Sequence, residues 1–468
     1  MLIKRASRRF ITELESVLPV LVGIFFVIVF LTTRFSLGDA DIYWHITTGQ
    51  WIMDHGSLPT VDTYSHTMFG RPWIAKEWLS QLLFAIAYRI GGWAGVATVA
   101  SIAIAAAFGL MAFFLLDRFA PVIVVLLVLS AYSLTLTQMM ARPHALAMPI
   151  LVSWAWGLIR ASEQGKAPSF LMLPLMVLWA NIHGSFLIGL ALIGPLAFEA
   201  AIASAKPVRL LTHWAVFTVL ALLATFLTPY GPGTLIAALS VLNLGEARTI
   251  VAEWQPQDFS TLNPFHMVLL SAIGFALLLG IKLPLLRIAL ILVLLHLALS
   301  QRRHADVLGL CVPLLLAGPL GRERERAQVH RPAMAVAFVL AVSTFAWAAT
   351  RQVLPPARAT PSAAVAMVKS LNAGPVLNYY DIGGYLIFAG VPTFIDGRTE
   401  LFGKSFVKRY NQAVLLHNFS DFLTILDEFK IEITLLRPDL PAVGLLDTTP
   451  KWKRIYSDDM AVVHIRSK

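Results

Sequence analysis

The chain carries repeated apolar runs of about 20 residues, the length that an α-helix needs to cross the hydrocarbon core of a bilayer. Its 468 residues are 57% hydrophobic and 14% charged, whereas soluble domains average about 45–50% apolar and about 25% charged residues. Because only helices and closed barrels satisfy their backbone groups in lipid, we expect an α-helical polytopic membrane bundle of about 11 spans. The expected spans lie near residues 17–34, 92–116, 119–137, 142–160, 168–182, 184–204, 211–228, 264–281, 283–300, 304–320 and 332–350.

Segment 75–90 is the main ambiguity in this topology. It is long enough for a short span, but it contains Glu77, Gln81 and Arg89, which favours a helix at the membrane interface. With 75–90 on the surface, the basic loops fall on one side of the membrane, which the positive-inside rule makes cytoplasmic. We therefore expect a cytoplasmic N-terminus and an extracytoplasmic C-terminus. Segment 234–244 reads as a surface or re-entrant helix. The basic loop residues are Lys4, Arg5, Arg8, Arg9, Arg118, Arg160, Lys166, Lys206, Arg209, Lys282, Arg322, Arg324, Arg326 and Arg331.

The net charge of +10 does not indicate a nucleic-acid partner. The basic residues lie at the N-terminus and between apolar segments, and they form no stripe interleaved with aromatic residues. The apolar run 17–31 follows basic residues, as in a signal peptide, but no small-x-small cleavage site follows it, so we expect an uncleaved signal-anchor helix. The single cysteine, Cys311, excludes an intrachain disulfide. The sequence has no Gly-x-Gly-x-x-Gly, Walker or His-Glu-x-x-His motif, which disfavours nucleotide-driven transport and zinc proteolysis.

The composition changes after Thr350, where the long apolar runs end. Residues 351–468 alternate short β-like runs with helical patterns, which predicts a small soluble α/β domain of about 110 residues. We therefore divide the chain into a membrane bundle at 1–350, with an outer loop at 35–91, and an α/β domain at 351–468. The expected strands are 375–380, 393–396, 431–436, 452–457 and 461–466, with a hairpin turn at 457–460, and the expected helices are 363–371 and 419–429.

Asp39 and Asp41 lie directly after the first apolar run. Charge at a membrane boundary is costly unless it faces water, a cation or a reacting partner. One carboxylate can take a proton from a hydroxyl group, and two can hold a divalent cation such as Mg²⁺ or Mn²⁺. The alternative is that Asp39 caps a helix that begins near Ala40. Glu77 is either a second acid–base group or an interfacial side chain, and His45 is either a ligand or a structural hydrogen-bonding partner.

Further polar clusters fall on the side of the membrane that this topology makes extracytoplasmic. Arg302 and Arg303 form the strongest cationic cluster, and guanidinium groups bind phosphate bidentately; anchoring to lipid headgroups is the alternative. Arg142 is either a phosphate ligand or a snorkelling side chain. In the α/β domain, Asp396 and Arg398 are expected to form a structural pair. The candidate donor-phosphate ligands are Arg142, Arg302, Arg303 and His304, and the candidate substrate-cavity residues are His45, His144, Asn181, His183 and Glu253.

These motifs resemble those of a set of largely uncharacterised bacterial membrane proteins and, through topology and the acidic loop, the GT-C superfamily of membrane glycosyltransferases. The matching motifs are Asp-Ala-Asp-Ile-Tyr-Trp-His45, Lys-Glu-Trp-Leu79, Ala-Arg-Pro-His144, Ala-Asn-Ile-His-Gly184, Glu-Trp-Gln255, Arg-Arg-His304, Tyr-Asp-Ile-Gly-Gly-Tyr385 and Phe-Ile-Asp-Gly-Arg398. The resemblance implies a polyprenyl-phosphate sugar donor, an extracytoplasmic acceptor and a catalytic role for Asp39 or Asp41. Metal dependence varies across the superfamily. The compact α/β tail differs from the outer domains of the best-known members.

Three functions are therefore compared. The first is a glycosyltransferase, in which Asp39, Asp41 and Glu77 supply the acid–base groups and the arginines bind the phosphate of the donor. The second is a transporter or flippase for lipid-linked glycans, with its site at Asn181 and His183, but the sequence shows no matching pair of broken segments, as many transporters have. The third is a scaffold whose outer domain binds a partner in a cell-envelope assembly.

Overall fold

The computed structural model describes residues 2–33, 36–241, 245, 251–325, 330–351 and 353–467, with the side chains of residues 2–12 left aside. The side chains of the basic residues near the N-terminus therefore lie outside the described part of the chain. Arg326 and the end of segment 234–244 lie outside the described residues. The chain divides into two compact units. One consists of Met1–Thr33, Ala94–Leu235 and Ala252–Val353, and the other of Arg34–Trp93, Ile236–Val251 and Leu354–Lys468.

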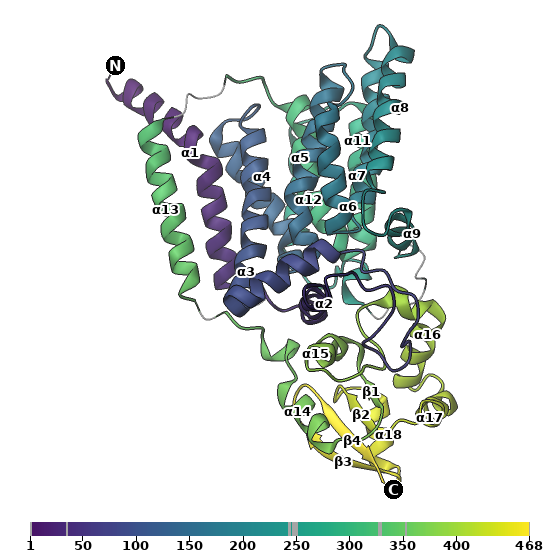
Figure 1. Cartoon of the computed structure of the whole chain (residues 1–468). Coiled ribbons are helices and arrows are strands. Elements are labelled where there is room, and N and C mark those ends of the chain that lie inside the picture. Colours follow the sequence, from purple (N-terminus) through teal and green to yellow (C-terminus); the bar gives the residue numbers. More distant parts are fainter. Residues whose placement is uncertain are drawn as a thin grey trace. The chain divides into compact units, whose positions relative to one another are not determined.

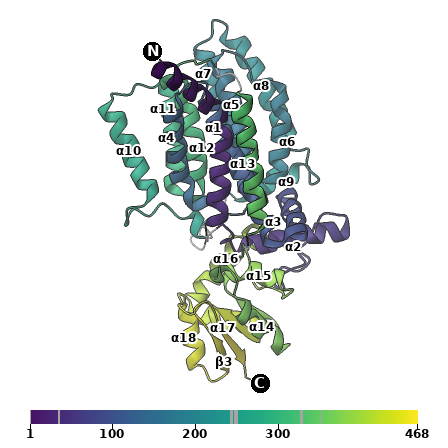
Figure 2. The same ribbon diagram turned by 90° about the vertical axis from the view of Figure 1, so that its left-hand side faces the viewer.

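The first unit is a bundle of apolar helices (Figures 1 and 2). Proline begins α4, α5, α8 and α10, where the N–H that it lacks has no partner within the helix. α13 packs along α1 in both views. The helices are α1 (Leu2–Thr32), the second part of α3 (Trp78–Leu115), α4 (Pro121–Thr135), α5 (Pro143–Glu163), α6 (Leu173–Ile182), α7 (Phe186–Ile202), α8 (Pro207–Ala224), α10 (Pro264–Leu278), α11 (Leu285–Ser300), α12 (Ala305–Leu320) and α13 (Arg331–Ala349).

The described helices confirm an α-helical membrane fold. Seven of them are long and apolar enough to cross a membrane, and four more apolar helices are shorter. Each of the expected spans overlaps one of these helices. The short ones are Phe170–Ile182, Phe186–Ile202, Pro264–Leu278 and Leu285–Ser300.

Helix α3 is broken at Gly91 and Gly92, whose backbone angles are not helical. Gly92 has φ 56°, a left-handed conformation that glycine adopts without steric cost. The segment from Trp78 to this break is therefore a separate helix that precedes the apolar run beginning near Trp93. The sequence expectation of a distinct helix in 75–90 agrees with this break.

The second unit contains a four-stranded sheet in the order β1-β2-β4-β3 (Figure 1). β1 (Val376–Asn378) is parallel to β2 (Ile433–Leu436), and β4 (Val462–Arg466) is antiparallel to both β2 and β3 (Trp452–Ser457). The hairpin expected at 457–460 is therefore present. The helices of this unit are α2 (Asp41–His55), the first part of α3, α9 (Pro232–Ser240, shared with the first unit), α14 (Ser362–Leu371), α15 (Gly383–Phe388), α16 (Thr399–Val414), α17 (Phe419–Glu428) and α18 (Pro441–Thr448).

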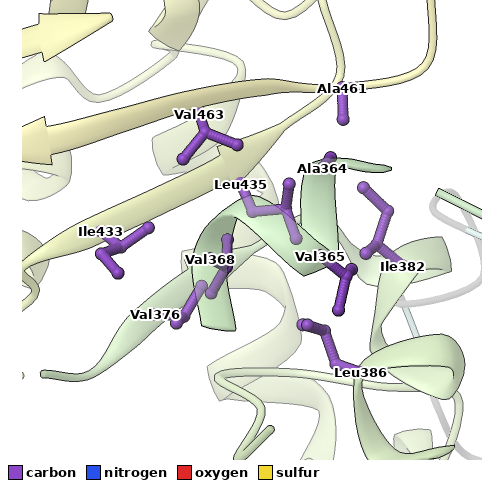
Figure 3. Packing of buried hydrophobic residues seen from close by; sticks show 10 residues of the cluster. All are labelled: Ala364, Val365, Val368, Val376, Ile382, Leu386, Ile433, Leu435, Ala461 and Val463. Carbon is purple, nitrogen blue, oxygen red and sulfur yellow. The ribbon is translucent and has the colours of Figure 1, made fainter. Parts of the chain in front are cut away.

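A buried apolar cluster joins α14 to the sheet (Figure 3). Helix α14 contributes residues three and four positions apart, which lie on the same face, and the strands contribute aliphatic side chains from the face that they meet. This packing fixes β1 and the turn that follows it, which leads into α15. The cluster consists of Ala364, Val365, Val368, Val376, Ile382, Leu386, Ile433, Leu435, Ala461 and Val463.

The strand expected at 393–396 does not join the sheet, so this expectation was wrong. Thr393 instead forms an isolated bridge with Ser65. The side chain of Asn378 accepts a hydrogen bond from the N–H of Phe394 (2.8 Å) and donates one to the carbonyl oxygen of Ile395 (2.7 Å). Because a loop and a side chain already satisfy these backbone groups, the segment has no need of a sheet partner.

Candidate active site

The acidic turn consists of Asp39, Ala40 and Asp41, at the start of α2. Asp39 Oδ1 accepts a hydrogen bond of 2.9 Å from the backbone N–H of Asp41. Two carboxylates in this position are favoured by the positive end of the helix dipole. Asp39 therefore makes a hydrogen bond at the helix start through an oxygen that asparagine also has, while Ala40 occupies the N-cap position.

Asp41 is held differently. Its Oδ1 accepts a hydrogen bond of 3.0 Å from the indole N–H of Trp44. Its carboxylate also lies directly against Gly397, where an added Cβ would collide with it. Gly384 lies in the same way against the carbonyl oxygen of Ala40. Two glycines of the C-terminal part of the chain thus let its backbone approach the acidic turn, which explains why glycine occupies both positions.

His45 and Glu77 lie together beside this turn. His45 is 3% exposed, and its Nε2 is 3.8 Å from the carboxylate of Glu77. The amide nitrogen of Gln81 is 3.4 Å from Nδ1, and because an amide nitrogen only donates, the proton of the neutral ring is on the side of Glu77. The His45 ring packs against Trp44, with ring centroids 3.8 Å apart. His45 thus packs against the indole that contacts Asp41, and Glu77 lies on the other side of the His45 network from Gln81.

Asp381 is a neighbouring carboxylate that the sequence reasoning did not single out. It lies in the turn Tyr380–Ile382 just before α15. Burial of its surroundings, together with the negative charge of Asp41, raises the pKa of Asp381 to about 6. The residue nevertheless keeps contact with solvent. Asp381 lies in the motif Tyr-Asp-Ile-Gly-Gly-Tyr385. A charged residue beside two glycines is the signal in the sequence that could have identified it as a candidate site residue.

Replacing Asp381 by asparagine is expected to stabilise the protein above pH 6. Because the folded state holds the proton up to about pH 6 and the unfolded state loses it near pH 4, ionisation of Asp381 opposes folding above that window. The expected gain in melting temperature is about 1–2 °C at pH 7.5, shrinking toward zero near pH 4. Melting curves of purified wild type and D381N across pH 4–8 measure this. A constant difference at every pH would contradict the assignment.

A buried charged triad fixes the surrounding loops of this unit. Arg398 and Asp62 are both 0% exposed. Arg398 donates to Asp62 at 2.6 Å and to the two oxygens of Asp396 at 2.8 and 2.7 Å. Its guanidinium also lies 5.0 and 4.8 Å from the ring centroids of Tyr64 and Trp73. Burial raises the pKa of Asp62. The positive charge of Arg398 and the hydrogen bonds to the carboxylate outweigh this effect, and the pKa of Asp62 lies below its ordinary value. The expected structural pair is present, with Asp62 as a third member.

A second candidate cluster lies in the helical unit and combines two arginines with one glutamate. Arg142 donates from Nη1 to Glu253 Oε2. Arg303 Nη1 is 3.8 Å from Glu253 Oε1, and its guanidinium lies 5.1 Å from the centroid of the Trp254 ring. Trp254 also donates its indole N–H to Glu253 at 3.0 Å. Arg142, Arg303 and Glu253 together carry a net charge of +1. The carboxylate of Glu253 contacts both guanidinium groups and holds them in place.

The other residues expected to bind phosphate are not all gathered there. Arg302 donates from Nε to the carbonyl oxygen of Pro256 at 3.0 Å, and its backbone N–H bonds to Gln255. It therefore fastens the segment that follows Glu253, which is a structural contact. His304 ends the same short 3₁₀ turn, Arg302–His304.

Asn181 lies in the last turn of α6, and His183 follows directly after that helix. The amide of Asn181 donates to the carbonyl oxygens of Val177 (2.8 Å) and Leu227 (3.1 Å), so it joins two helix ends. The rings of His144 and His183 lie 6.2 Å apart. Among the residues that the structure describes, no group of three or more His, Cys, Asp or Glu side chains is arranged to hold a metal ion.

No protein-family model matches the chain, and no curated protein matches it in sequence. Solved structures do match. The apo oligosaccharyltransferase of Archaeoglobus fulgidus has a TM-score of 0.51 at 12% identity, over 91% of this chain and 69% of that one. The oligosaccharyltransferase AglB of the same organism, in complex with an inhibitory peptide and a dolichol-phosphate, has a TM-score of 0.49 at 12% identity, over 92% and 70%. Apo ArnT of Cupriavidus metallidurans has a TM-score of 0.44 at 14% identity, over 96% and 97%.

The first of these similarities extends over most of both chains, and at 12% identity it concerns the fold. It agrees with a bundle of apolar helices followed by a small domain with a sheet. The chain therefore shares its fold, which is of the GT-C type, with the oligosaccharyltransferase of Archaeoglobus fulgidus.

Proposed function

We propose that this protein is a membrane glycosyltransferase that moves a sugar from a polyprenyl-phosphate donor to an extracytoplasmic acceptor. The observation that carries the proposal is the placement of Asp41: its carboxylate is oriented by Trp44 and lies against the side-chain-free Gly397, in a chain with a GT-C-type fold. The acceptor is a glycan, lipid or protein of the cell envelope. The enzyme lies in the bacterial inner membrane with its N-terminus in the cytoplasm.

In the proposed reaction Asp41 acts as the general base. It takes the proton of an acceptor hydroxyl while the hydroxyl oxygen attacks the anomeric carbon of the sugar. The bond from that carbon to the phosphate oxygen breaks, and the lipid phosphate leaves with the electron pair. Direct displacement inverts the anomeric centre. A positioned general base typically contributes about 10²–10⁴-fold to the rate.

The arginine–glutamate cluster is proposed to bind the donor phosphate. Two guanidinium groups converge on Glu253, and only one positive charge is neutralised there. Guanidinium groups form strong bidentate bonds to phosphate, and fixed positive charge stabilises a phosphate that gains charge as it leaves. Glu253 keeps both side chains in position before the donor arrives, which lowers the entropic cost of binding.

Replacing Arg142 or Arg303 by glutamine is expected to weaken donor binding by about 10–100-fold, because a hydrogen bond to a charged group contributes about 1.5–3 kcal/mol. Binding of undecaprenyl phosphate to protein in nanodiscs measures this. The matched control is R351Q, since Arg351 also lies 5.1 Å over a tryptophan, Trp347, in the helical unit. Equal affinity in all variants would exclude the cluster as the phosphate site.

The expected Mg²⁺ or Mn²⁺ at Asp39 and Asp41 stays a prediction. Asp39 is already bonded to the start of α2. The described residues offer no set of three or more ligands together, so a cation here would rest on Asp41 and take its other ligands from water and phosphate oxygens, as Mg²⁺ usually does. Such an ion would supply positive charge to the phosphate.

Mass spectrometry of envelope glycans and glycolipids tests the proposed function in the cell. A deletion strain is compared with the same strain carrying the wild-type gene. The proposal expects one sugar modification to disappear on deletion and to return with the wild type. An unchanged set of glycans in the deletion strain, together with a changed distribution of lipid-linked glycans across the membrane, would favour the transporter.

A further inference from the structure

Segment 393–400 of the C-terminal domain is attached to the outer loop, which belongs to the same compact unit. The attachment begins with the backbone of Thr393. Its N–H donates to the carbonyl oxygen of Tyr64 at 3.1 Å, and its carbonyl oxygen accepts the N–H of His66 at 3.0 Å. Because backbone hydrogen bonds run in both directions, the start of the segment and this part of the loop are fixed against each other.

The end of the segment is attached to the outer loop through two ion pairs. Arg398 Nη1 is 2.6 Å from the carboxylate of Asp62, and both side chains are 0% exposed. Glu400 pairs with Lys76, and these two side chains are 16% and 14% exposed. Opening such a buried pair leaves each charge without its partner in a place that water hardly reaches, which is costly. The outer loop is therefore held at both ends of the segment.

The segment itself is fixed to the sheet. Asn378, the last residue of β1, is 0% exposed and binds the backbone of Phe394 and Ile395 through its side chain. Within the segment, the hydroxyl of Thr393 donates to Asp396 Oδ2 at 3.0 Å. The sheet thus sets the place of the segment, and the segment sets the place of the outer loop.

Gly397 lies in this segment, against the carboxylate of Asp41. A Cβ added to Gly397 would lie 2.7 Å from Asp41 Cγ, whereas carbon atoms in contact are about 3.5–4.0 Å apart. Gly397 does not have a positive φ, so the space beside Asp41, and not the backbone conformation, accounts for glycine here. The indole N–H of Trp44 donates to the same carboxylate at 3.0 Å. The carboxylate therefore has one contact from its own helix and one from the C-terminal domain.

A general base works only where its oxygen meets the proton that it takes, and a misplacement of about 1 Å can cost about 10²-fold in rate. We propose that segment 393–400 positions the carboxylate of Asp41 for the transfer reaction, with Gly397 as the positioning residue. The C-terminal domain then takes part in the reaction, which a domain that only binds a partner would not do. This inference rests on the proposed function, in which Asp41 is the general base.

Replacing Gly397 by alanine changes the space beside Asp41. Because the added methyl group meets the end of a side chain and not the backbone, the carboxylate moves and the fold is retained. We expect G397A to lower turnover by about 10–100-fold and to keep its affinity for undecaprenyl phosphate. The matched control is G374A, where the added Cβ would also lie 2.7 Å from the carbon of a carboxylate, that of the exposed Glu432. G374A should keep turnover within a few-fold of the wild type.

A double-mutant cycle with D41A shows whether Gly397 acts through Asp41. D41A removes the carboxylate and leaves room for the added methyl group. We therefore expect D41A and D41A/G397A to have the same residual turnover and the same melting temperature, so that every effect of G397A is lost in the D41A background. If G397A alone does not fold, D41A/G397A is expected to fold like D41A.

The experiment uses the full-length protein in nanodiscs, with a membrane extract as the source of acceptor. The probes are the phosphodiesters of undecaprenyl phosphate with a hexose, a pentose and an N-acetylhexosamine. Turnover is measured at saturating probe as the release of undecaprenyl phosphate, and binding of undecaprenyl phosphate is measured separately. Melting curves of the same variants in detergent complete the cycle.

Three results would overturn the inference. They are equal turnover in G397A and G374A, an equal fold-loss from G397A with and without the Asp41 carboxylate, and a D41A/G397A variant that does not fold although D41A does. Transfer by the wild type and its loss in D41A would in each case leave the proposed function standing. A wild type that releases no undecaprenyl phosphate from any probe would overturn the proposed function and this inference together.

Discussion

Replacing Asp41 by asparagine is expected to lower turnover by about 10²–10⁴-fold, the contribution of a positioned general base. Asparagine has nearly the same shape and can still accept the indole hydrogen bond of Trp44 through its amide oxygen. It cannot take a proton at neutral pH. Sugar transfer by the purified variant measures the effect, and its melting temperature shows that the fold is retained.

Asp39 provides the matched control. Its carboxylate accepts the backbone N–H of Asp41, and asparagine is as good a residue as aspartate for satisfying a helix start. D39N should therefore keep turnover within a few-fold of the wild type. The assignment fails if D39N abolishes transfer and D41N does not, and full turnover in both variants would exclude a carboxylate base at this turn.

Replacing Arg398 by leucine is expected to destabilise the protein by about 3–5 kcal/mol, because it leaves Asp62 and Asp396 buried without their shared cation. Both aspartates are 0% exposed, and the guanidinium also loses the rings of Tyr64 and Trp73. For a folding unit of this size the expected fall in melting temperature is about 6–20 °C. Thermal melting of the detergent-solubilised full chain measures it.

Arg437 is the control for this substitution. It pairs with Asp439 at 2.8 Å, but the two side chains are 46% and 64% exposed, and such surface pairs contribute about 0–1 kcal/mol. R437L should thus melt within about 3 °C of the wild type. Similar melting temperatures for R398L and R437L would show that the buried triad does not hold the loops together.

The helical framework could be predicted because its physical rule is local. A run of about 20 apolar residues has few alternatives to a membrane helix, and each expected run overlaps a helix. The same local reasoning failed at 393–396, where a short β-like run predicted a strand. The backbone of this segment is hydrogen-bonded by the side-chain amide of Asn378, which contacts Phe394 and Ile395. The residues of the segment itself do not indicate that contact.

The candidate site was predictable as a set of residues but not as contacts. The sequence indicated Arg142, Glu253 and Arg303 as polar groups near apolar runs, and the structure joins them in one cluster. From the sequence, Arg302 and Arg303 were equally good candidates for binding phosphate. In the structure, the side chain of Arg302 instead donates to the carbonyl oxygen of Pro256. Asp62 could not be paired with Arg398 beforehand, because 336 positions separate them and many carboxylates in the chain were available.

The most direct measurement is sugar transfer by purified protein in nanodiscs, with the polyprenyl-phosphate donor that the envelope glycans indicate and a membrane extract as the source of acceptor. Wild-type protein is predicted to release polyprenyl phosphate and to form a glycosylated acceptor with inverted anomeric configuration, while D41N is predicted to do so at least about 10²-fold more slowly. Movement of the intact donor across vesicle membranes by both proteins, without any transfer of its sugar, would contradict the account.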